Sequence, residues 1–340
     1  MASGSGSRYG SRRLFRATLV RTKGSQMSKI LNFERILCPV AESHETDEGL
    51  LYAIALSRSY RAKLFVLTCN DDSSRIDSDT VEAMRTNIKR AVEHSCVLFP
   101  CEVAGGHLDY EFVVTESSRP ADSIKHEAEK QDADLIVMSS RRRPYAAALL
   151  GSTAETVCRT ASCPVLVTRS GEGRPLRSAV RNFEFKKLLV ASDFSSDSEL
   201  AFRYGLSLAQ EYQSELHLLH VLTDSKTTET ELAWTSQSAE GPYHVAARQL
   251  HQSVPAETHL WCDIMHVVRE GKAHREILSY AVEQEIDLIL IGAHGQGFRL
   301  GSLFGSNTDR VLREAPCPAL VVRPLKPAAR PVGLNREGKG

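Results

Sequence analysis

The sequence predicts two consecutive α/β domains, each with an open parallel sheet covered by helices on both faces. Short apolar runs without polar alternation, such as residues 288–291, are typical of strands buried on both sides. Stretches with a helical period separate these runs. Alternating strands and helices form parallel sheets, and a chain of 340 residues suits two such domains better than one.

An internal repeat with a period of about 150 residues indicates a domain duplication and not a solenoid. A helical stripe recurs in both halves: Ala201, Gly205, Leu208, Ala209 and Tyr212 match Gly49, Ala53, Leu56, Ser57 and Tyr60. The matching strand segments are 35–40 and 187–192, 63–67 and 215–219, 134–137 and 287–290, and 163–167 and 317–321. Between them we expect a helix near 78–98 with a strand at 108–115, and a helix near 243–253 with a strand at 262–268. Residues 223–242 have the composition of a loop.

These matches place the domains at 33–169 and 185–324, with a linker at 170–184 and a disordered tail at 325–340. Residues 1–32 are expected to form a disordered basic leader, because seven Lys and Arg residues occur there without an acid. Such a leader is an unstructured extension, an over-long start ahead of Met27, or an organellar transit peptide. The expected location is the cytoplasm, or an organelle in the last case.

Composition argues against several classes of function. The 42 basic residues balance the 42 acidic ones, so net charge gives no reason to expect binding to nucleic acid. No apolar run is long enough to cross a membrane. Eight cysteines without a C-x-x-C pair are typical of reduced thiols. A zinc site is not expected, since His217 and His220 lie on opposite sides of a predicted strand.

A glycine-rich loop after the run at 288–291 is the strongest functional signal. Glycines stand at 292, 295, 297, 301 and 305, and Ser306 and Asn307 then open a helix. Glycine lets the backbone approach a ligand closely, and a helix N-terminus favours an anion. The spacing fits neither G-x-x-x-x-G-K-[ST] nor G-x-G-x-x-G. The loop therefore predicts a phosphate site, while the alternative is a tight turn that needs glycine for its own geometry, with Ser306 only capping the helix.

The spacing Gly292, two residues, Gly295, nine residues, Gly305-Ser306 resembles the nucleotide-binding signature of the universal stress protein family, in its ATP-binding branch. The strand at 317–322 looks like the family's last strand, and the duplicated layout resembles its tandem members. The resemblance implies a Rossmann-like sheet of order 3-2-1-4-5 in each half. It also implies that the halves pair through their last strands, near 164–168 and 318–323.

The resemblance further implies a site for ATP or a related adenine nucleotide, with or without Mg²⁺, in the second half. Asp193 would accept hydrogen bonds from the ribose or the base, because a capping box of Ser196 and Glu199 leaves it free of the helix cap. Ligands of such sheets lie where the strand order reverses, at the ends of the first and fourth strands. The expected nucleotide-binding residues are Ala191, Ser192, Asp193, Val221, Gly292, His294, Gly295, Gly305, Ser306 and Asn307.

The first half lacks most of these positions. Ala41 stands where Asp193 stands. The glycines at 292 and 295 map onto Met138 and Arg141, or onto Ser139 and Arg142 if the gap is placed differently, and only Gly151 and Ser152 remain. We therefore expect one nucleotide per chain and a structural or partner-binding first half.

The resemblance implies a protein that acts in stress response or signalling through nucleotide-dependent interactions with a protein partner or a second copy. One alternative is a slow ATPase or phosphotransferase, and another is a scaffold that binds no nucleotide. Binding is favoured over catalysis, because no general base or metal-binding pair of acids is evident in the sequence.

Overall fold

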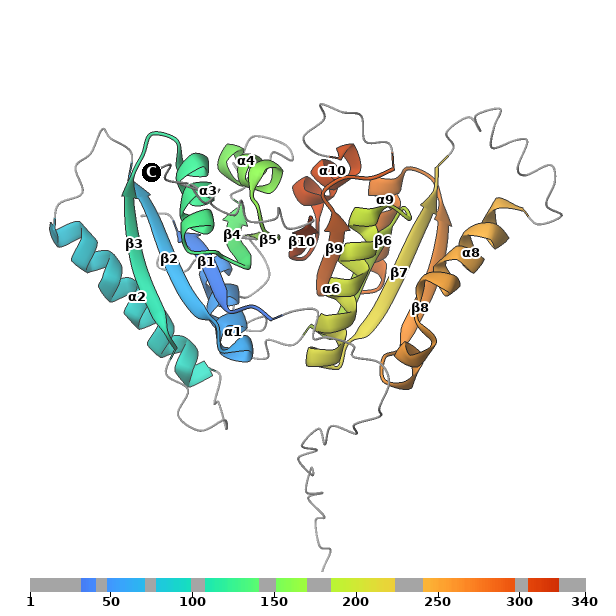
Figure 1. Ribbon diagram of the computed structural model, residues 1–340, viewed down its shortest axis with the longest axis horizontal. Coiled ribbons are helices and arrows are strands. Elements are labelled where there is room, and N and C mark those ends of the chain that lie inside the picture. The colour runs from blue at the N-terminus through green and yellow to red at the C-terminus, as the bar shows by residue number, and fades with distance from the viewer. Residues whose placement is uncertain are drawn as a thin grey trace, which may run out of the picture.

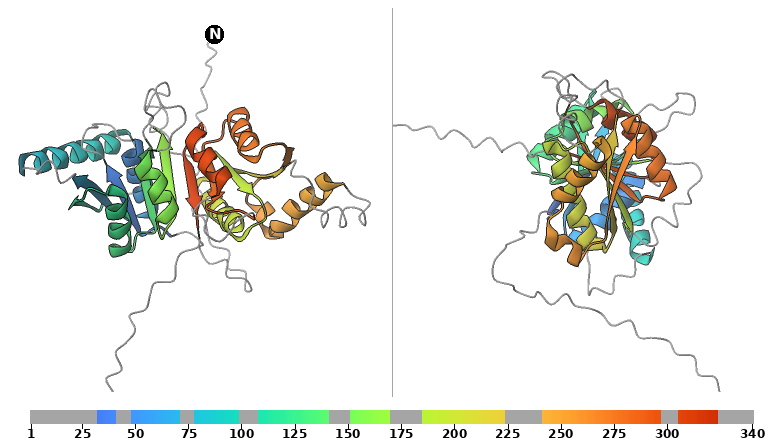
Figure 2. Two further views of the ribbon diagram at one scale, coloured as in Figure 1. Left: turned by 90° about the horizontal axis from the view of Figure 1, so that it is seen from above. Right: turned by 90° about the vertical axis from the view of Figure 1, so that its right-hand side faces the viewer.

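The computed structural model describes residues 32–40, 48–70, 78–98, 108–140, 151–169, 185–223, 241–296 and 305–323. Within these residues the chain forms two α/β halves that share one sheet, with helices on both faces (Figures 1 and 2). The predicted leader, linker and tail lie almost entirely outside the described residues, as do Ala41, Arg141 and Arg142.

Both halves follow the predicted alternation of strands and helices. The first contains β1 (Arg35–Val40), α1 (Glu48–Tyr60), β2 (Lys63–Asn70), α2 (Ser78–Leu98), β3 (Tyr110–Glu116), α3 (Pro120–Lys130), β4 (Leu135–Ser140), α4 (Ser152–Thr160) and β5 (Val165–Arg169). The second contains β6 (Lys187–Ser192), α6 (Ser196–Tyr212), β7 (Glu215–Leu222), α8 (Pro242–Ser253), η1 (Ala256–Leu260), β8 (Ile264–Glu270), α9 (Ala273–Glu283), β9 (Leu288–Gly292), α10 (Ser306–Glu314) and β10 (Ala319–Val322).

The ten strands form a single open sheet of order β3-β2-β1-β4-β5-β10-β9-β6-β7-β8. Each half thus has the predicted order 3-2-1-4-5, with parallel neighbours throughout. The two halves join through β5 and β10, which pair antiparallel with Leu320 opposite Leu166. The prediction of pairing through the last strands is confirmed.

An aspartate before each fourth strand ties that strand to the first strand of its half. One oxygen of Asp134 accepts from the backbone N–H groups of Glu34 and Arg35, both at 2.9 Å. Asp287 accepts in the same way from Lys186 and Lys187, at 2.8 and 2.9 Å. Counting onward from Asp134 and Asp287 aligns the halves, and it selects Ser139 and Arg142 as the counterparts of the glycines at 292 and 295.

The hydrophobic core is continuous across the joint. One apolar cluster contains Leu166 and Leu320 together with buried residues of α1 and α6, while the other contains Val165 and Val321 with residues of α4 and α10. Large aliphatic side chains on both faces of the inner strands therefore bury both sides of the sheet. Each apolar cluster therefore contains residues of both halves.

Polar contacts also cross between the halves. The buried guanidinium of Arg323 donates to the backbone oxygens of Cys158, Arg159 and Ala161 at the end of α4. Arg313 of α10 pairs with Glu155 of α4 at 2.9 Å. The Arg323 bonds satisfy carbonyl groups that the end of a helix otherwise leaves without partners.

The described part of the chain contains no helix long and apolar enough to span a bilayer. The cysteines described there form no disulfide with one another: Cys38, Cys69, Cys158, Cys163, Cys262 and Cys317.

Candidate functional site

The ends of β6 and β9 lie side by side in the second half, where the strand order reverses. Ala191 pairs with Ile291 in the parallel ladder, so Asp193 and the glycine-rich loop emerge next to each other. Open α/β sheets bind their ligands at this position. The fold therefore brings together the two segments that the sequence separates by about 100 residues.

Asp193 links the end of β6 to the glycine-rich loop. One of its oxygens accepts from the backbone N–H and the hydroxyl of Ser195, at 3.1 and 2.5 Å. The other accepts from the backbone N–H of Gln296 at 2.9 Å. A carboxylate has about four acceptor positions, so these three bonds leave room for one more donor.

The helix cap differs from the prediction by one residue. Ser195, and not Ser196, is the N-cap of α6, and its hydroxyl accepts from the backbone N–H of Ser198. Phe194 just before it has a left-handed φ of 61°, which turns the chain from β6 into the helix. The expectation that Asp193 does not cap α6 stands, although its carboxylate supports the residue that does.

Neighbouring protein atoms crowd two of the glycines, Gly292 at the end of β9 and Gly295 in the loop. A β-carbon at Gly295 would lie 2.4 Å from a carboxylate oxygen of Asp193. At Gly292 it would lie 2.8 Å from the β-carbon of Asp197 and 2.9 Å from its carbonyl carbon. Contacts this close require a shift of the neighbour. The packing of the loop thus accounts for both glycines without a ligand.

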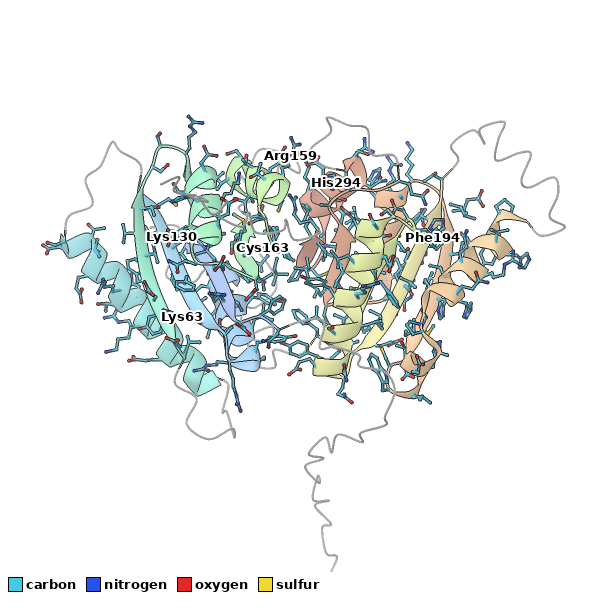
Figure 3. The ribbon with its side chains drawn as sticks, in the orientation of Figure 1. Lys63, Lys130, Arg159, Cys163, Phe194 and His294 are labelled. Carbon is cyan, nitrogen blue, oxygen red and sulfur yellow. The ribbon has the colours of Figure 1, made fainter. Side chains whose placement is uncertain are left out.

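Asp197 is a residue of the site that sequence reasoning missed. It is buried in the first turn of α6, and its Oδ2 atom accepts from the backbone N–H of His294 at 3.1 Å. The same oxygen lies 3.0 Å from the ring Nδ1 of His294. His294 lies at the upper end of the second half (Figure 3). Its ring is thereby held against α6.

The N-terminus of α10 closes the other side of the loop. Gly305 is the N-cap, so no N-cap side chain accepts from the first N–H groups of the helix. Ser306 and Asn307 are exposed. Thr308 anchors the helix by donating its hydroxyl to the carbonyl oxygen of Gly292 at 2.8 Å. The first N–H groups of a helix have no partner within it, so this end is suited to an anion.

The remaining predicted residues lie on β6 and β7. Ala191 is buried, and Val221 is partly buried and packs on the same apolar cluster. The backbone oxygen of Ser192 lies 2.8 Å from Nδ1 of His220, which also contacts the ring of Phe194. Burial lowers the pKa of His220 below its ordinary value. His220 is thus a neutral, partly buried neighbour of the site at pH 7.

In the first half, a side chain fills the space beside the fourth strand. Ser139 occupies the position of Gly292, and its hydroxyl accepts from the backbone N–H of Gly49 in the first turn of α1 at 2.8 Å. The same hydroxyl lies 3.1 Å from that of Thr168 on β5. The first half therefore uses a side-chain bond where the second half has close backbone packing.

The family model for the universal stress protein family matches this chain twice, over residues 32–169 and 184–323. The two matches together cover well over half of the sequence. The chain belongs to the universal stress protein family. Its two halves are two copies of the same domain, as the repeat predicted.

Individual relatives agree with this assignment. The universal stress protein E homolog of Haemophilus influenzae is 21% identical over 320 residues, which cover 87% of this chain and 99% of the relative. A universal stress protein of Mycobacterium tuberculosis is 28% identical over 199 residues, or 56% of this chain and only 62% of the relative. The crystal structure of a universal stress protein from Archaeoglobus fulgidus superimposes with a TM-score of 0.59 at 21% identity, covering 86% of this chain and 99% of that one.

In this universal stress protein the ten predicted residues lie around one end of the β6–β9 pair. Asp193, Gly292, His294, Gly295 and Gly305 are joined through direct or shared contacts. Ser306 and Asn307 lie beyond Gly305, at the exposed start of α10. Sequence reasoning missed Ser195, Asp197, His220 and Gln296, which hold these residues in place. Of these, only the serine before α6 carried a local signal, as a candidate helix cap.

Proposed function

We propose that this universal stress protein binds one ATP, or a related adenine nucleotide, in its second half. The observation that carries the proposal is the meeting of Asp193, the glycine-rich loop and the N-terminus of α10 at the switch point of the sheet. This edge offers an acceptor for a hydroxyl or amino group beside donors for an anion. A nucleotide presents both kinds of group.

The phosphates would contact the start of α10 and the loop backbone at Gly292, Gly295, Gly305 and Ser306. The remaining acceptor position of Asp193 would take a hydrogen bond from the ribose or the base. Ala191, Ser192 and Val221 would lie beside the base, and His294 and Asn307 beside the phosphates. No cluster of three His, Cys, Asp or Glu side chains in the described residues can hold a metal ion, so we assign no protein ligand to a Mg²⁺ that accompanies ATP.

We propose that the protein acts in stress response or signalling, and that nucleotide binding alters its contacts with a protein partner or a second copy. The first half would serve as a structural or partner-binding module. We place the protein in the cytoplasm, because reduced thiols are typical of that compartment and the six described cysteines form no disulfide.

The test is titration calorimetry of the full chain with ATP, and of the variant Ser306→Pro. Ser306 is the first residue of α10, where proline is accepted, and Gly305 before it has φ −69° and ψ 134°, which suit a residue preceding proline. The change removes one N–H and one hydroxyl while preserving the helix. Loss of one bond to a charged group costs about 1.5–3 kcal/mol, a tenfold or greater loss of affinity.

The matched control is Ser152→Pro in the first half. Ser152 is the first residue of α4 and follows Gly151, whose φ of −55° and ψ of 139° are nearly those of Gly305. This variant should bind ATP with unchanged affinity and a stoichiometry of one. Two sites per chain, or full affinity in Ser306→Pro, would show that the nucleotide lies elsewhere. No heat at all from the full chain would favour the scaffold, and release of ADP would favour the enzyme.

A further inference from the structure

Three histidines from three elements meet at the outer edge of the second half. His266 lies on the edge strand β8, His251 on α8 and His259 on η1. The rings of His251 and His266 stack with their centroids 3.9 Å apart, and the ring of His259 lies 6.0 Å from that of His266. We call these three residues the histidine cluster.

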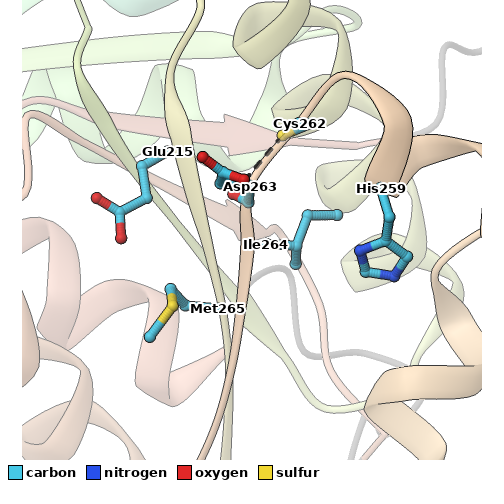
Figure 4. Close-up of a pocket in the computed structure, with 6 residues that line it drawn as sticks. All are labelled: Glu215, His259, Cys262, Asp263, Ile264 and Met265. Atoms are coloured by element: carbon cyan, nitrogen blue, oxygen red, sulfur yellow. Dashed lines mark hydrogen bonds between the residues drawn. The ribbon is translucent and has the colours of Figure 1, made fainter.

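The surroundings of His266 provide no countercharge. Its neighbour on β7 is the buried Leu218, and the groups whose charge acts on it are His251 and His259. The other ionisable side chains of α8 and η1 are Tyr243, His244, Arg248 and Glu257, all exposed. Figure 4 shows Glu215 on the opposite side of β8 from His259, although both line one pocket. A positive charge on His266 would therefore be repelled by a charge on His251 or His259.

His266 is also poorly placed to hold a proton. Its Nε2 atom is buried and has no hydrogen-bond partner among the described residues. Burial first, then repulsion from His251 and His259, lower the pKa of His266 to about 4. An imidazole in an unfolded chain has a pKa near 6.5. The pKa of His266 is thus lower in the folded chain than in the unfolded chain. Its contribution to the free energy of unfolding is therefore fully present above pH 6.5 and is lost as the pH falls below that value.

We propose that the histidine cluster is a proton-sensitive latch that holds α8 and η1 against the edge of the sheet and releases them in acid. In the closed state α8 covers the sheet with Leu250, and Val254 and Cys262 pack in the same apolar cluster. Release of α8 would expose this apolar surface. The latch is independent of nucleotide binding, since it lies on α8, η1 and β8 and uses none of the residues at the end of β9.

The first half contains a matching contact without a titratable histidine. Phe112 occupies in β3 the position of His266 in β8, opposite Val66 as His266 is opposite Leu218. Arg85 of α2 lies over the Phe112 ring at 5.9 Å from its centroid. An arginine keeps its charge at all accessible pH values. The first half should thus keep α2 in place in acid while the second half releases α8.

Trp261, which ends η1 and packs on the core, is a local reporter of the latch. The chain has two tryptophans, so Trp234→Phe in the full-length protein leaves Trp261 as the only one. Acrylamide quenching of Trp261 should be weak near pH 7.5. It should rise reversibly by about twofold or more on acidification to about pH 4.5, since α8 and η1 open locally.

The decisive variant adds His266→Phe to the Trp234→Phe protein, which places the first half's residue in the second half. Quenching should then stay low across the same pH range. If His266→Phe does not fold, His251→Gln provides the test, because loss of one exposed imidazole should move the rise to lower pH. His244→Gln, on α8 but outside the cluster, should leave the rise unchanged.

Two results would overturn the proposal. One is a rise in quenching that is unchanged when His266→Phe, or His251→Gln, is added to the Trp234→Phe protein. That result would place the acid-sensitive group elsewhere. The other is the absence of any rise in the Trp234→Phe protein down to about pH 4.5, which would show that the cluster stays closed when protonated.

Discussion

A single carboxylate oxygen of Asp197 lies 3.1 Å from the backbone nitrogen and 3.0 Å from the ring Nδ1 of His294. This contact ties the first turn of α6 to the glycine-rich loop. It also places a negative side chain at the positive end of the α6 dipole, where it is favourable. Asp197 therefore holds the start of the loop against α6.

We expect Asp197→Ala to lower the free energy of unfolding by about 1–3 kcal/mol, because the backbone N–H of His294 loses its acceptor. It should also weaken ATP binding, since the loop is no longer held. Urea denaturation and calorimetry measure the two effects. Glu199→Ala is the control: it also removes an acid from the first turn of α6, but Glu199 is solvent-facing and pairs with Arg203. Equal effects of both changes would argue that the helix dipole, and not the loop contact, is what matters.

Gly295 and Asp193 should be energetically coupled. Gly295→Ala should destabilise the protein by about 1–3 kcal/mol, because the new β-carbon would lie 2.4 Å from the Asp193 carboxylate. In an Asp193→Ala background that oxygen is absent. The loss of unfolding free energy caused by Gly295→Ala should then be smaller by about 1 kcal/mol or more. Urea denaturation of the four proteins in this cycle gives the coupling energy. A coupling of zero would mean that the glycine is needed for something other than this contact.

Arg323 should be a strong link between the halves. Arg323→Ala leaves the carbonyl groups of Cys158, Arg159 and Ala161 without their buried donor, and we expect a loss of about 2–4 kcal/mol. Arg203→Ala, which removes a surface ion pair on α6, should cost under about 1 kcal/mol. Chemical denaturation compares the two. Similar small losses would indicate that water replaces the guanidinium without cost.

The stability of the whole chain should fall in mild acid. Burial lowers the pKa of His217, and the pKa values of His220 and His266 are lowered as well. Each of these groups binds fewer protons folded than unfolded below pH 6.5, so the free energy of unfolding decreases as pH falls. Urea melts at about pH 7.5 and about pH 5.5 should show this difference.

Replacing one buried pair should reduce that pH dependence. Nδ1 of His217 lies 2.7 Å from the hydroxyl of Tyr280, and the two can be removed together as His217→Leu with Tyr280→Phe. Both polar partners then disappear, which avoids an unpaired buried group. An unchanged difference between the two pH values would mean that His217 does not contribute to it.

The second half alone, from about residue 182, should dimerise through β10. Without β5, the backbone groups of Ala319–Val322 and the apolar side chains beside them lose their cover. A second copy offers the same edge for antiparallel pairing. Sedimentation at tens of micromolar measures the state, and a monomer at that concentration would show that the edge is protected in another way.

Strand content and topology were predictable because buried strands such as β9 have no polar alternation and because each half repeats the other. The joint of β5 and β10 also followed from the family resemblance. The start of α6 was wrong by one residue, since Ser195 and Ser196 are both good caps and the left-handed Phe194 decides between them.

The meeting of the candidate residues at one end of the sheet was predictable, and the contacts among them were less so. Asp193 and the loop residues do meet, as the switch point requires. The partner of His294 was not visible, because Asp197 lies 97 positions away and no short-range pattern links them. The glycines at 292 and 295 suggested a ligand, whereas Asp197 and Asp193 already crowd the place of a β-carbon there. Sequence patterns report that space is restricted, without reporting what restricts it.

The joint between β5 and β10 also bears on how the two copies could diverge. Where two identical chains associate, any change appears twice, and the pair dissociates on dilution. Here the neighbour is attached to the same polypeptide, so its effective concentration does not depend on how much protein is present. One copy can then keep only what its neighbour needs, namely an edge at β5 and carbonyl groups for Arg323. Ser139 in place of a glycine is a change that such a copy tolerates, and the duplicated domain becomes free to acquire a task of its own.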